Sequence, residues 1–342
     1  MTDSTLELYG MLMSPYSMKM RAYLRYRRIP FNWRTGLIAN HIAETKVQTY
    51  MIPVIGYPDG TFENDSTPII DKLEASIAGR RTEPENEADA FLAYLIEDFA
   101  DEWLLWPFFI NRWGTSADQK HNSHWILYEA LHGNLTDGVF EPMAEGWASR
   151  QIDLVKRTCG SPANDDILNE SLHAFLRVME STVTNGLFFF GSRPSRAEIA
   201  IYGILSQLIQ DLSPSADMRE NYTFTTRWVS IIDDLSGIDG EWEALSTNPE
   251  KLMATPVAEI LKMSGKYHLP LLHANAEAMD NGEQYFSFDT DGRKFERETH
   301  ERHKTCLPAL QKRYADLSSE SKAALKDVLE ESACLNYLAA GN

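Results

Sequence analysis

The stretch Ser14-Pro15-Tyr16-Ser17 decides the fold of the first part of the chain. It follows residues 6–10, where apolar residues alternate with polar or small ones as they do in a short strand. Ser14 is a residue type that caps helix N-termini, and Pro15 suits a first helical turn, where its missing N–H is not needed. We therefore expect a strand, a tight turn and a helix whose N-terminus directs a partial positive charge at any group beside Ser14. Taken alone, the stretch favours a plain helix cap.

The composition is that of a folded and strongly acidic protein. Of the 342 residues, 43% are hydrophobic and 24% are charged, which suffices to bury a core in two or three domains. The net charge of -18, from 32 Lys and Arg against 50 Asp and Glu, argues against nucleic acid or an anionic membrane as partner. It does not exclude a small ligand in a locally basic pocket.

The sequence features that report on location favour the cytoplasm. The first residues lack a basic segment followed by an apolar run, so we expect no signal peptide. No stretch approaches the length of uninterrupted apolar sequence that spans a membrane. Cys159, Cys306 and Cys334 are scattered and odd in number, which fits a reducing compartment better than a disulfide framework.

Strand and helix signals alternate through the first 80 residues. After the first helix, the patterns predict a strand at 31–34, a loose helix at 38–48, and a strand at 51–57 that contains Pro53. Residues 57–60 form a strong hairpin turn that leads into a further strand at 61–63. Residues 64–68 then supply caps and an early proline for a helix that extends to Ile77.

The patterns become almost wholly helical beyond a charged linker at 80–88. One long helix is predicted over 91–106, ending at Pro107. Further helices are predicted at 117–132, 136–156, 165–184, 199–209 and 219–235. Ser195 and Glu198 form a capping box at the start of the 199–209 helix. The last hundred residues predict helices at 256–279, 298–315 and 319–338, and a hairpin that pairs 285–288 with 294–295.

The first 80 residues together resemble the thioredoxin-like domain of the cytosolic glutathione transferase superfamily. The resemblance is carried, in order, by the Ser14–Ser17 turn, the cis-proline strand motif Ile52-Pro53-Val54, the Asp59-Gly60 hairpin and the acidic-Ser motif Asp65-Ser66-Thr67. The segment 194–198 resembles the capping box on the family's central helix. Glu198 stands where the family usually has Asp, which is a departure from the pattern.

The resemblance implies an α+β fold with three consecutive parts. Residues 1–80 would form a thioredoxin-like glutathione-binding domain, 88–250 an all-helical transferase domain, and 251–342 a C-terminal extension of helices and the possible hairpin. The extension exceeds the usual family length. The resemblance also implies a homodimer.

The chemistry of the family requires that the pKa of the glutathione thiol fall from about 8.5 toward neutrality. The resemblance assigns the hydrogen bond to the sulfur to Ser14, with the helix N-terminus supplying a positive field. Tyr9 and Tyr16 are rival donors in the same stretch. An arrangement that activates no thiol is the remaining alternative.

The resemblance also distributes the parts of glutathione along the first domain. Ile52 or Val54, next to Pro53, would pair with the cysteinyl backbone. Asp65 would bind the γ-glutamyl ammonium, while Ser66 and its helix N-terminus would bind the carboxylate. Read without the resemblance, Asp65 and Ser66 form an ordinary helix cap. The glycyl carboxylate needs a polar or cationic partner, for which the candidates are His41, Lys46 and Gln48.

Aromatic residues on the long helix are candidates for the pocket of a second, electrophilic substrate. The candidates are Trp103, Trp106, Arg112 and Trp113. An aromatic core stripe at helical spacing explains the same pattern equally well. His300, His303 and Cys306 share a spacing of three but spread around a charged helix without an evident fourth ligand, so we expect no metal.

Two functions of different classes follow. The first is a cytoplasmic glutathione transferase that uses the thiolate on a small, hydrophobic or aromatic electrophile, in detoxifying conjugation or related lyase, isomerase or dehalogenase chemistry. The second is an inactive transferase-fold scaffold whose tail binds a partner. Thiol exchange of the glutaredoxin type is disfavoured, because it needs a cysteine at position 14 and the first cysteine is Cys159.

Overall fold

The computed structural model describes residues 5–339, which fall into two compact units. Of the described residues, unit 1 contains 5–82, 111–151 and 198–239. Unit 2 contains residues 83–110, 152–197 and 240–339. Each unit is made of three separate segments of the chain, so the two units do not test the three consecutive domains expected from the sequence. Those domain boundaries stay a prediction.

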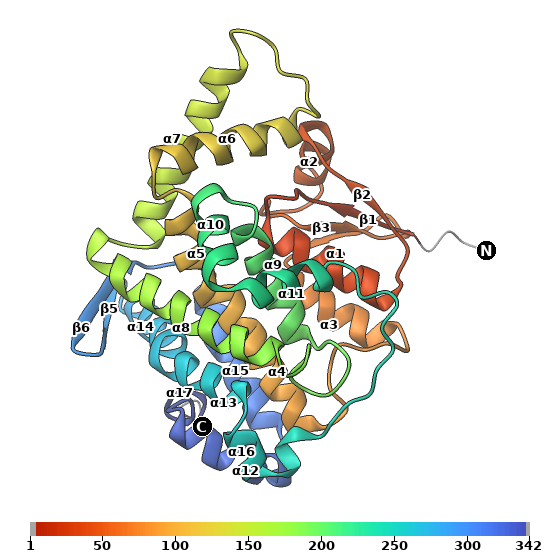
Figure 1. Ribbon diagram of the computed structural model, residues 1–342, viewed down its shortest axis with the longest axis vertical. Coiled ribbons are helices and arrows are strands. Elements are labelled where there is room, and N and C mark those ends of the chain that lie inside the picture. The colour runs from red at the N-terminus through yellow and green to blue at the C-terminus, as the bar shows by residue number, and fades with distance from the viewer. Residues whose placement is uncertain (1–4, 340–342) are drawn as a thin grey trace. The chain divides into compact units, whose positions relative to one another are not determined.

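Unit 1 is built on a four-stranded mixed sheet in the order β2-β1-β3-β4 (Figure 1). The strands are β1 (Leu6–Tyr9), β2 (Phe31–Arg34), β3 (Val54–Gly56) and β4 (Phe62–Asn64). β1 runs parallel to β2 and antiparallel to β3, and β3 runs antiparallel to β4. Leu8 and Ile55 lie opposite each other in the register and are both fully buried, because the central strands are covered. The expected thioredoxin-like sheet and the α+β class are confirmed.

Apart from α7 (Phe140–Thr158), which is divided between the two units, seven helices of the described chain lie wholly or mainly in unit 1. They are α1 (Pro15–Arg27), α2 (Leu37–Glu44), α3 (Ser66–Ser76), α6 (Ser116–Ala130), α9 (Arg196–Leu208), α10 (Leu212–Asn221) and α11 (Thr223–Ile232). The prediction of one helix over 219–235 is wrong. Tyr222, with φ -137° and ψ 56°, leaves the helical region and separates α10 from α11. The buried Tyr222 side chain anchors this break in a way that periodicity does not register.

The long helix of unit 2 continues past the proline at which it was expected to end. It comprises α4 (Glu87–Phe99), a π-helical turn η1 (Ala100–Leu104) and α5 (Leu105–Arg112), so the predicted end at Pro107 is wrong. A π-helical turn directly before a proline changes the hydrogen-bond ladder where the ring would otherwise clash with the preceding turn, which is how helices accommodate proline.

The remaining described elements are helices and one hairpin. The helices are α7 (Phe140–Thr158), α8 (Asp165–Val183), α12 (Pro249–Met253), α13 (Pro256–Met263), α14 (Leu269–Asp280), α15 (His303–Asp316), α16 (Ser319–Glu331) and α17 (Leu335–Leu338), with a second π-helical turn η4 (Ser264–His268). The predicted hairpin is confirmed as β5 (Tyr285–Thr290) and β6 (Arg293–Glu298), with Phe288 opposite Phe295. The tail therefore has the expected kinds of element.

A buried charge network joins the tail to the long helix inside unit 2. Glu102 accepts a hydrogen bond from Arg302 Nε at 3.1 Å, and its other oxygen lies 3.0 Å from His303 Nε2. Arg297, which is 1% exposed, donates to His303 Nδ1 at 3.1 Å. His303 is therefore neutral, with its proton on Nε2 facing Glu102. Complete burial, together with the nearby Arg297 cation, lowers the pKa of His303 to about 3 despite Glu102.

This network predicts that acid destabilises the protein well above the range where carboxylates titrate. Below the ordinary histidine pKa of 6.5 the unfolded chain gains a proton that folded His303 does not take up. The free energy of unfolding should therefore be about 2 kcal/mol lower at pH 5 than at neutral pH from this group. Urea unfolding of the wild type and of His303→Gln at both pH values measures the difference.

The variant should lose most of this pH dependence. His273→Gln is the matched control, since the His273 side chain lies in the same unit, is 39% exposed and forms its ion pair with the exposed Glu277. The control should retain the wild-type dependence on pH. An equal fall in stability for the wild type and His303→Gln would contradict the assignment.

Candidate functional site

The register of the sheet brings three of the predicted motifs to one edge. Tyr9 ends β1 and pairs with Val54, which begins β3, and Val54 in turn pairs with Asn64, which ends β4. The turn before α1 follows β1, the Ile52-Pro53 peptide precedes β3, and Asp65 follows β4. All three segments therefore leave the sheet at the same edge, because paired residues lie side by side across the strands.

Ser14 caps α1 as expected. Its backbone is extended, with φ -110° and ψ 119°, and its Oγ accepts a hydrogen bond from Ser17 N at 3.3 Å. Ser14 is 8% exposed. Since the cap uses only an acceptor lone pair, the hydroxyl proton remains to be donated, and no acceptor for it is seen among residues 5–339.

The turn that carries Ser14 is held by a buried arginine from α5. Arg112 donates to the Met13 carbonyl at 2.8 Å and makes a two-point contact with Asp211 at 2.8 and 2.9 Å. It also donates to Gln207, whose own amide donates to the Leu12 carbonyl at 3.0 Å. Four of these contacts use Arg112, which is 4% exposed. These contacts hold the turn in place. The assignment of Arg112 to a substrate pocket stays a prediction.

The peptide between Ile52 and Pro53 is cis, which confirms the cis-proline strand that the sequence predicted. Val54 follows with no exposed surface and packs with Tyr9 and Ala43 in a small apolar cluster. Ile52 is half-buried and lies just outside the strand. These residues form the rim of the sheet edge described above.

The start of α3 has the features of an anion site. Ser66 is 1% exposed, and its Oγ has no hydrogen-bond partner among the described residues. Asp65 precedes it with φ 76° and ψ 113°, and its side chain makes no capping bond to the helix. Lys19 from α1 is fully buried and donates to Thr67 Oγ1 at 3.2 Å. A buried donor, a helix N-terminus and a cation thus meet at one place.

The remaining candidates of the first domain occupy different environments. Tyr9 is 9% exposed and its ring lies 6.1 Å from that of Phe62, in the small core cluster, whereas Tyr16 is half-buried at the start of α1. His41 is exposed and lies 3.3 Å from Glu44. Lys46 and Gln48 are both exposed, with Lys46 Nζ 5.7 Å from the Phe62 ring centroid. These contacts do not separate the three candidates for the glycyl carboxylate.

The candidate tryptophans are all core residues. Trp103 is fully buried, donates to Ser171 Oγ at 3.0 Å and stacks on Tyr267 at 5.1 Å in unit 2. Trp106, which is 4% exposed, donates to the Glu102 carbonyl at 2.6 Å. Trp113 is also 4% exposed, and its Nε1 has no partner among the described residues. Their place in a substrate pocket stays a prediction, and their packing is that of an aromatic core.

Unit 2 contains a serine, a histidine and an aspartate in the order that nucleophilic catalysis uses. Ser264 Oγ lies 3.0 Å from His268 Nδ1, and His268 Nε2 lies 2.7 Å from Asp98 Oδ1. A catalytic nucleophile must be reached by its substrate, but Ser264 is 1% exposed and His268 is fully buried. The three side chains therefore satisfy one another inside the core.

The described residues 5–339 contain neither a cluster of metal ligands nor a helix suited to a membrane. No group of three or more His, Cys, Asp or Glu side chains is arranged so that it could hold a metal ion. No helix in this range is both long enough and apolar enough to cross a membrane.

One family model matches the N-terminal part of the chain, and more distant similarities extend over about two thirds of it. Residues 8–81 match the family described as "Glutathione S-transferase, N-terminal domain". Prostaglandin E synthase 2 of Danio rerio is 24% identical over 274 residues, which cover 67% of this chain and 70% of that protein. The solved beta-etherase LigF of Sphingobium sp. is 17% identical with a TM-score of 0.45, and the match covers 68% of this chain and 95% of the other. A glutathione S-transferase of Methylobacillus flagellatus, solved with GSH bound, is 17% identical with a TM-score of 0.38, and the match covers 68% and 96% of the two chains.

The Arg112 contacts predict a large loss of stability when the guanidinium is removed. Arg112→Met leaves Asp211 buried without its cation and releases the Met13 carbonyl, so unfolding should require about 3 kcal/mol less free energy. Urea unfolding measures the change. Arg150→Met, at an exposed position on α7, is the control and should change stability little. A loss below that of the control would show that the buried pair does not hold the turn.

Proposed function

We propose that the chain, whose residues 8–81 match the N-terminal domain of glutathione S-transferases, binds glutathione at the edge of the sheet where β1 ends and β3 begins. There it would hold the thiol as a thiolate and use it on a small apolar electrophile. The single observation that carries the proposal is the buried Ser66 hydroxyl at the N-terminus of α3, which has no hydrogen-bond partner among residues 5–339.

The start of α3 would bind the γ-glutamyl end of the tripeptide. A carboxylate there would accept the Ser66 proton and the first N–H groups of the helix, which gives the hydroxyl the partner it lacks. Lys19, at Thr67, adds a positive charge where an anion would lie. Asp65 would pair with the ammonium group. The half-buried Ile52 and the buried Val54 would offer backbone groups to the cysteinyl residue.

Ser14 would stabilise the thiolate as a hydrogen-bond donor. Its cap interaction with Ser17 uses only a lone pair, so its proton can be directed at a sulfur beside the N-terminus of α1. The α1 dipole adds a positive field at the same place. The residue would activate a bound thiol and exchange none, because the chain has no cysteine before Cys159.

The match of residues 8–81 to the glutathione S-transferase N-terminal domain supports a glutathione-dependent enzyme over an inactive scaffold, and the binding experiment below separates the two functions. The electrophile belongs to the apolar or aromatic class. A homodimer in the cytoplasm is the form in which we expect the protein to act.

Calorimetry with glutathione tests the binding site. We expect the wild type to bind, and Ser66→Ala to weaken binding at least tenfold, because a hydrogen bond to a charged group is lost. Asp65→Ala should weaken it as well. Ser76→Ala, at the exposed end of the same helix, is the matched control and should bind as the wild type does. If the wild type does not bind glutathione at millimolar concentration, the proposal is wrong and the inactive scaffold function is favoured.

Steady-state kinetics with an aryl halide test the role of Ser14. Ser14→Ala should lower turnover about 100-fold and raise the apparent pKa of the bound thiol, with little change in KM for glutathione. Ser14→Thr keeps a hydroxyl and should restore most of the rate. An unchanged rate in Ser14→Ala would move the role to Tyr9 or Tyr16.

A further inference from the structure

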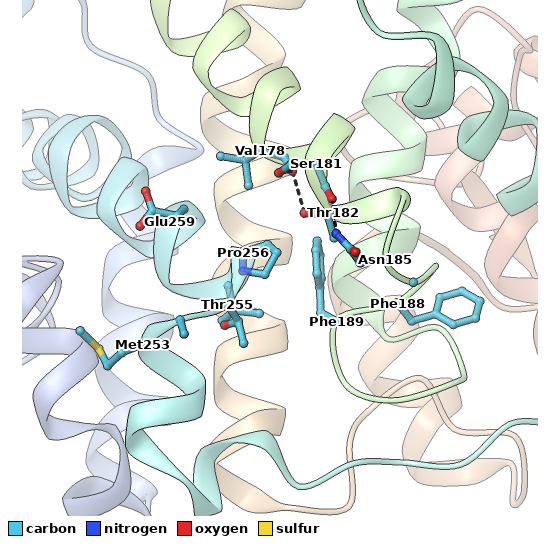
Figure 2. A pocket seen from close by; sticks show the side chains of 13 residues that line it. Val178, Ser181, Thr182, Asn185, Phe188, Phe189, Met253, Thr255, Pro256 and Glu259 are labelled. Carbon is cyan, nitrogen blue, oxygen red and sulfur yellow. Dashed lines mark hydrogen bonds between the residues drawn. The ribbon is translucent and has the colours of Figure 1, made fainter.

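Unit 2 contains a cavity of about 580 Å³ that the proposed glutathione chemistry does not use. It lies between the C-terminal end of α8, the connector that follows it, and the junction of α12 with α13 (Figure 2). Its volume falls in the range of small-molecule sites. The residues that line the cavity belong to unit 2, whereas those of the proposed glutathione site belong to unit 1, so a ligand of the cavity does not depend on the proposed function.

The hydroxyl groups of this cavity can only accept hydrogen bonds. Ser181 and Thr182 each donate their proton to the Val178 carbonyl, at 2.8 and 2.7 Å. On the opposite wall Thr255 donates to the Leu252 carbonyl at 2.6 Å. Because each hydroxyl has one proton and that proton is committed to the main chain, only lone pairs remain for a ligand.

The other polar side chains of the cavity also offer hydrogen-bond acceptors. Asn185 donates its amide to the Ser181 carbonyl at 2.9 Å, which leaves its side-chain oxygen as an acceptor. Glu259 contributes a carboxylate, of which Oε1 accepts a hydrogen bond from Lys262 at 3.0 Å and Oε2 is left for a ligand; Lys262 Nζ also lies 3.0 Å from Glu331. The C-terminal end of α8 adds a partial negative charge, and the N-terminus of α13, which begins at Pro256 in the opposite wall, adds a partial positive charge. No lysine, arginine or histidine is among the residues that line the cavity.

Apolar side chains provide the rest of the wall. In Figure 2 the Phe189 ring lies between Asn185 on one side and Pro256 with Thr255 on the other, whereas the Phe188 ring points away from them. Val178 and Val257 also line the cavity. An aromatic face beside a set of acceptors favours a cation that carries an apolar body.

We propose that this cavity binds a small primary ammonium ion with an aromatic or aliphatic body. The three N–H groups of the ammonium ion would donate hydrogen bonds to Glu259, Thr255 and Ser181. The apolar part of the ligand would contact Phe189. The net charge of -18 favours the approach of a cation to any part of the surface, so the arrangement of acceptors and the aromatic ring decides the place.

Calorimetry with three probes of one shape tests the proposal. The probes are the phenethylammonium ion, the neutral 2-phenylethanol and the anionic 3-phenylpropanoate. We expect only the ammonium ion to bind at millimolar concentration. The side chains that line the cavity offer hydrogen-bond acceptors, and none of them is cationic. Equal binding of the alcohol or tighter binding of the carboxylate would overturn the proposal, as would absence of ammonium binding.

Two variants locate the binding. Gly186 lines the cavity, and a Cβ built there meets nothing within 4 Å, so Gly186→Trp fills the space without a clash at Cβ. It should abolish binding, whereas Gly237→Trp, at an equally open glycine outside the cavity, should leave it unchanged. Glu259→Gln should lower the affinity for the ammonium ion roughly fivefold, as expected for the loss of a partly exposed ion pair. Retained binding in Gly186→Trp would place the ligand elsewhere and refute the site.

Discussion

The pairing of Tyr9 with Val54 and of Val54 with Asn64 is the constraint on which the candidate glutathione site depends. These residues stand at the ends of their strands, so the three segments that leave the sheet do so at one edge. A shift of one residue in this register would turn Val54 from the core to the opposite face and displace the start of α3 relative to the turn before α1. The site is thus a consequence of strand pairing, and its loops need only add the right side chains.

The turn before α1 needs more than the sheet to keep its shape. Its carbonyl groups at Leu12 and Met13 face Gln207 and Arg112, and Arg112 is in turn fixed by Asp211. Burying this ion pair costs desolvation, which its two-point geometry and the further hydrogen bonds offset. The arrangement gives orientation at the turn rather than a large gain in stability. A helix cap that must also aim a hydroxyl requires such support, because a mobile turn would lose the direction of the donor.

Local patterns predicted most of the fold, and long-range contacts explain what they missed. The Ser14 cap, the four strands and the 285–298 hairpin each follow from residues within a few positions of one another, and the structure bears them out. The passage of the long helix through Pro107 depends on a π-helical turn, and the break at Tyr222 depends on a buried side chain, neither of which periodicity records. At the candidate site, the resemblance assigned a role to Ser66, but only the three-dimensional structure shows that its hydroxyl has no hydrogen-bond partner among the described residues. The partner of Arg112 lies 99 positions away, so no spacing could have revealed it.

The two candidate ligand sites differ in charge preference for one physical reason, which is where hydroxyl protons are directed. Ser66 has a proton with no acceptor in the described part of the chain, and the buried cation of Lys19 contacts the neighbouring Thr67, so its surroundings favour an anion. Ser181 and Thr182 have given their protons to the main chain, so their surroundings favour a cation. Net charge cannot make this distinction, because the same acidic chain contains both arrangements. Serine and threonine are therefore neutral in a sequence count but act as donors or acceptors according to the carbonyl that lies within reach.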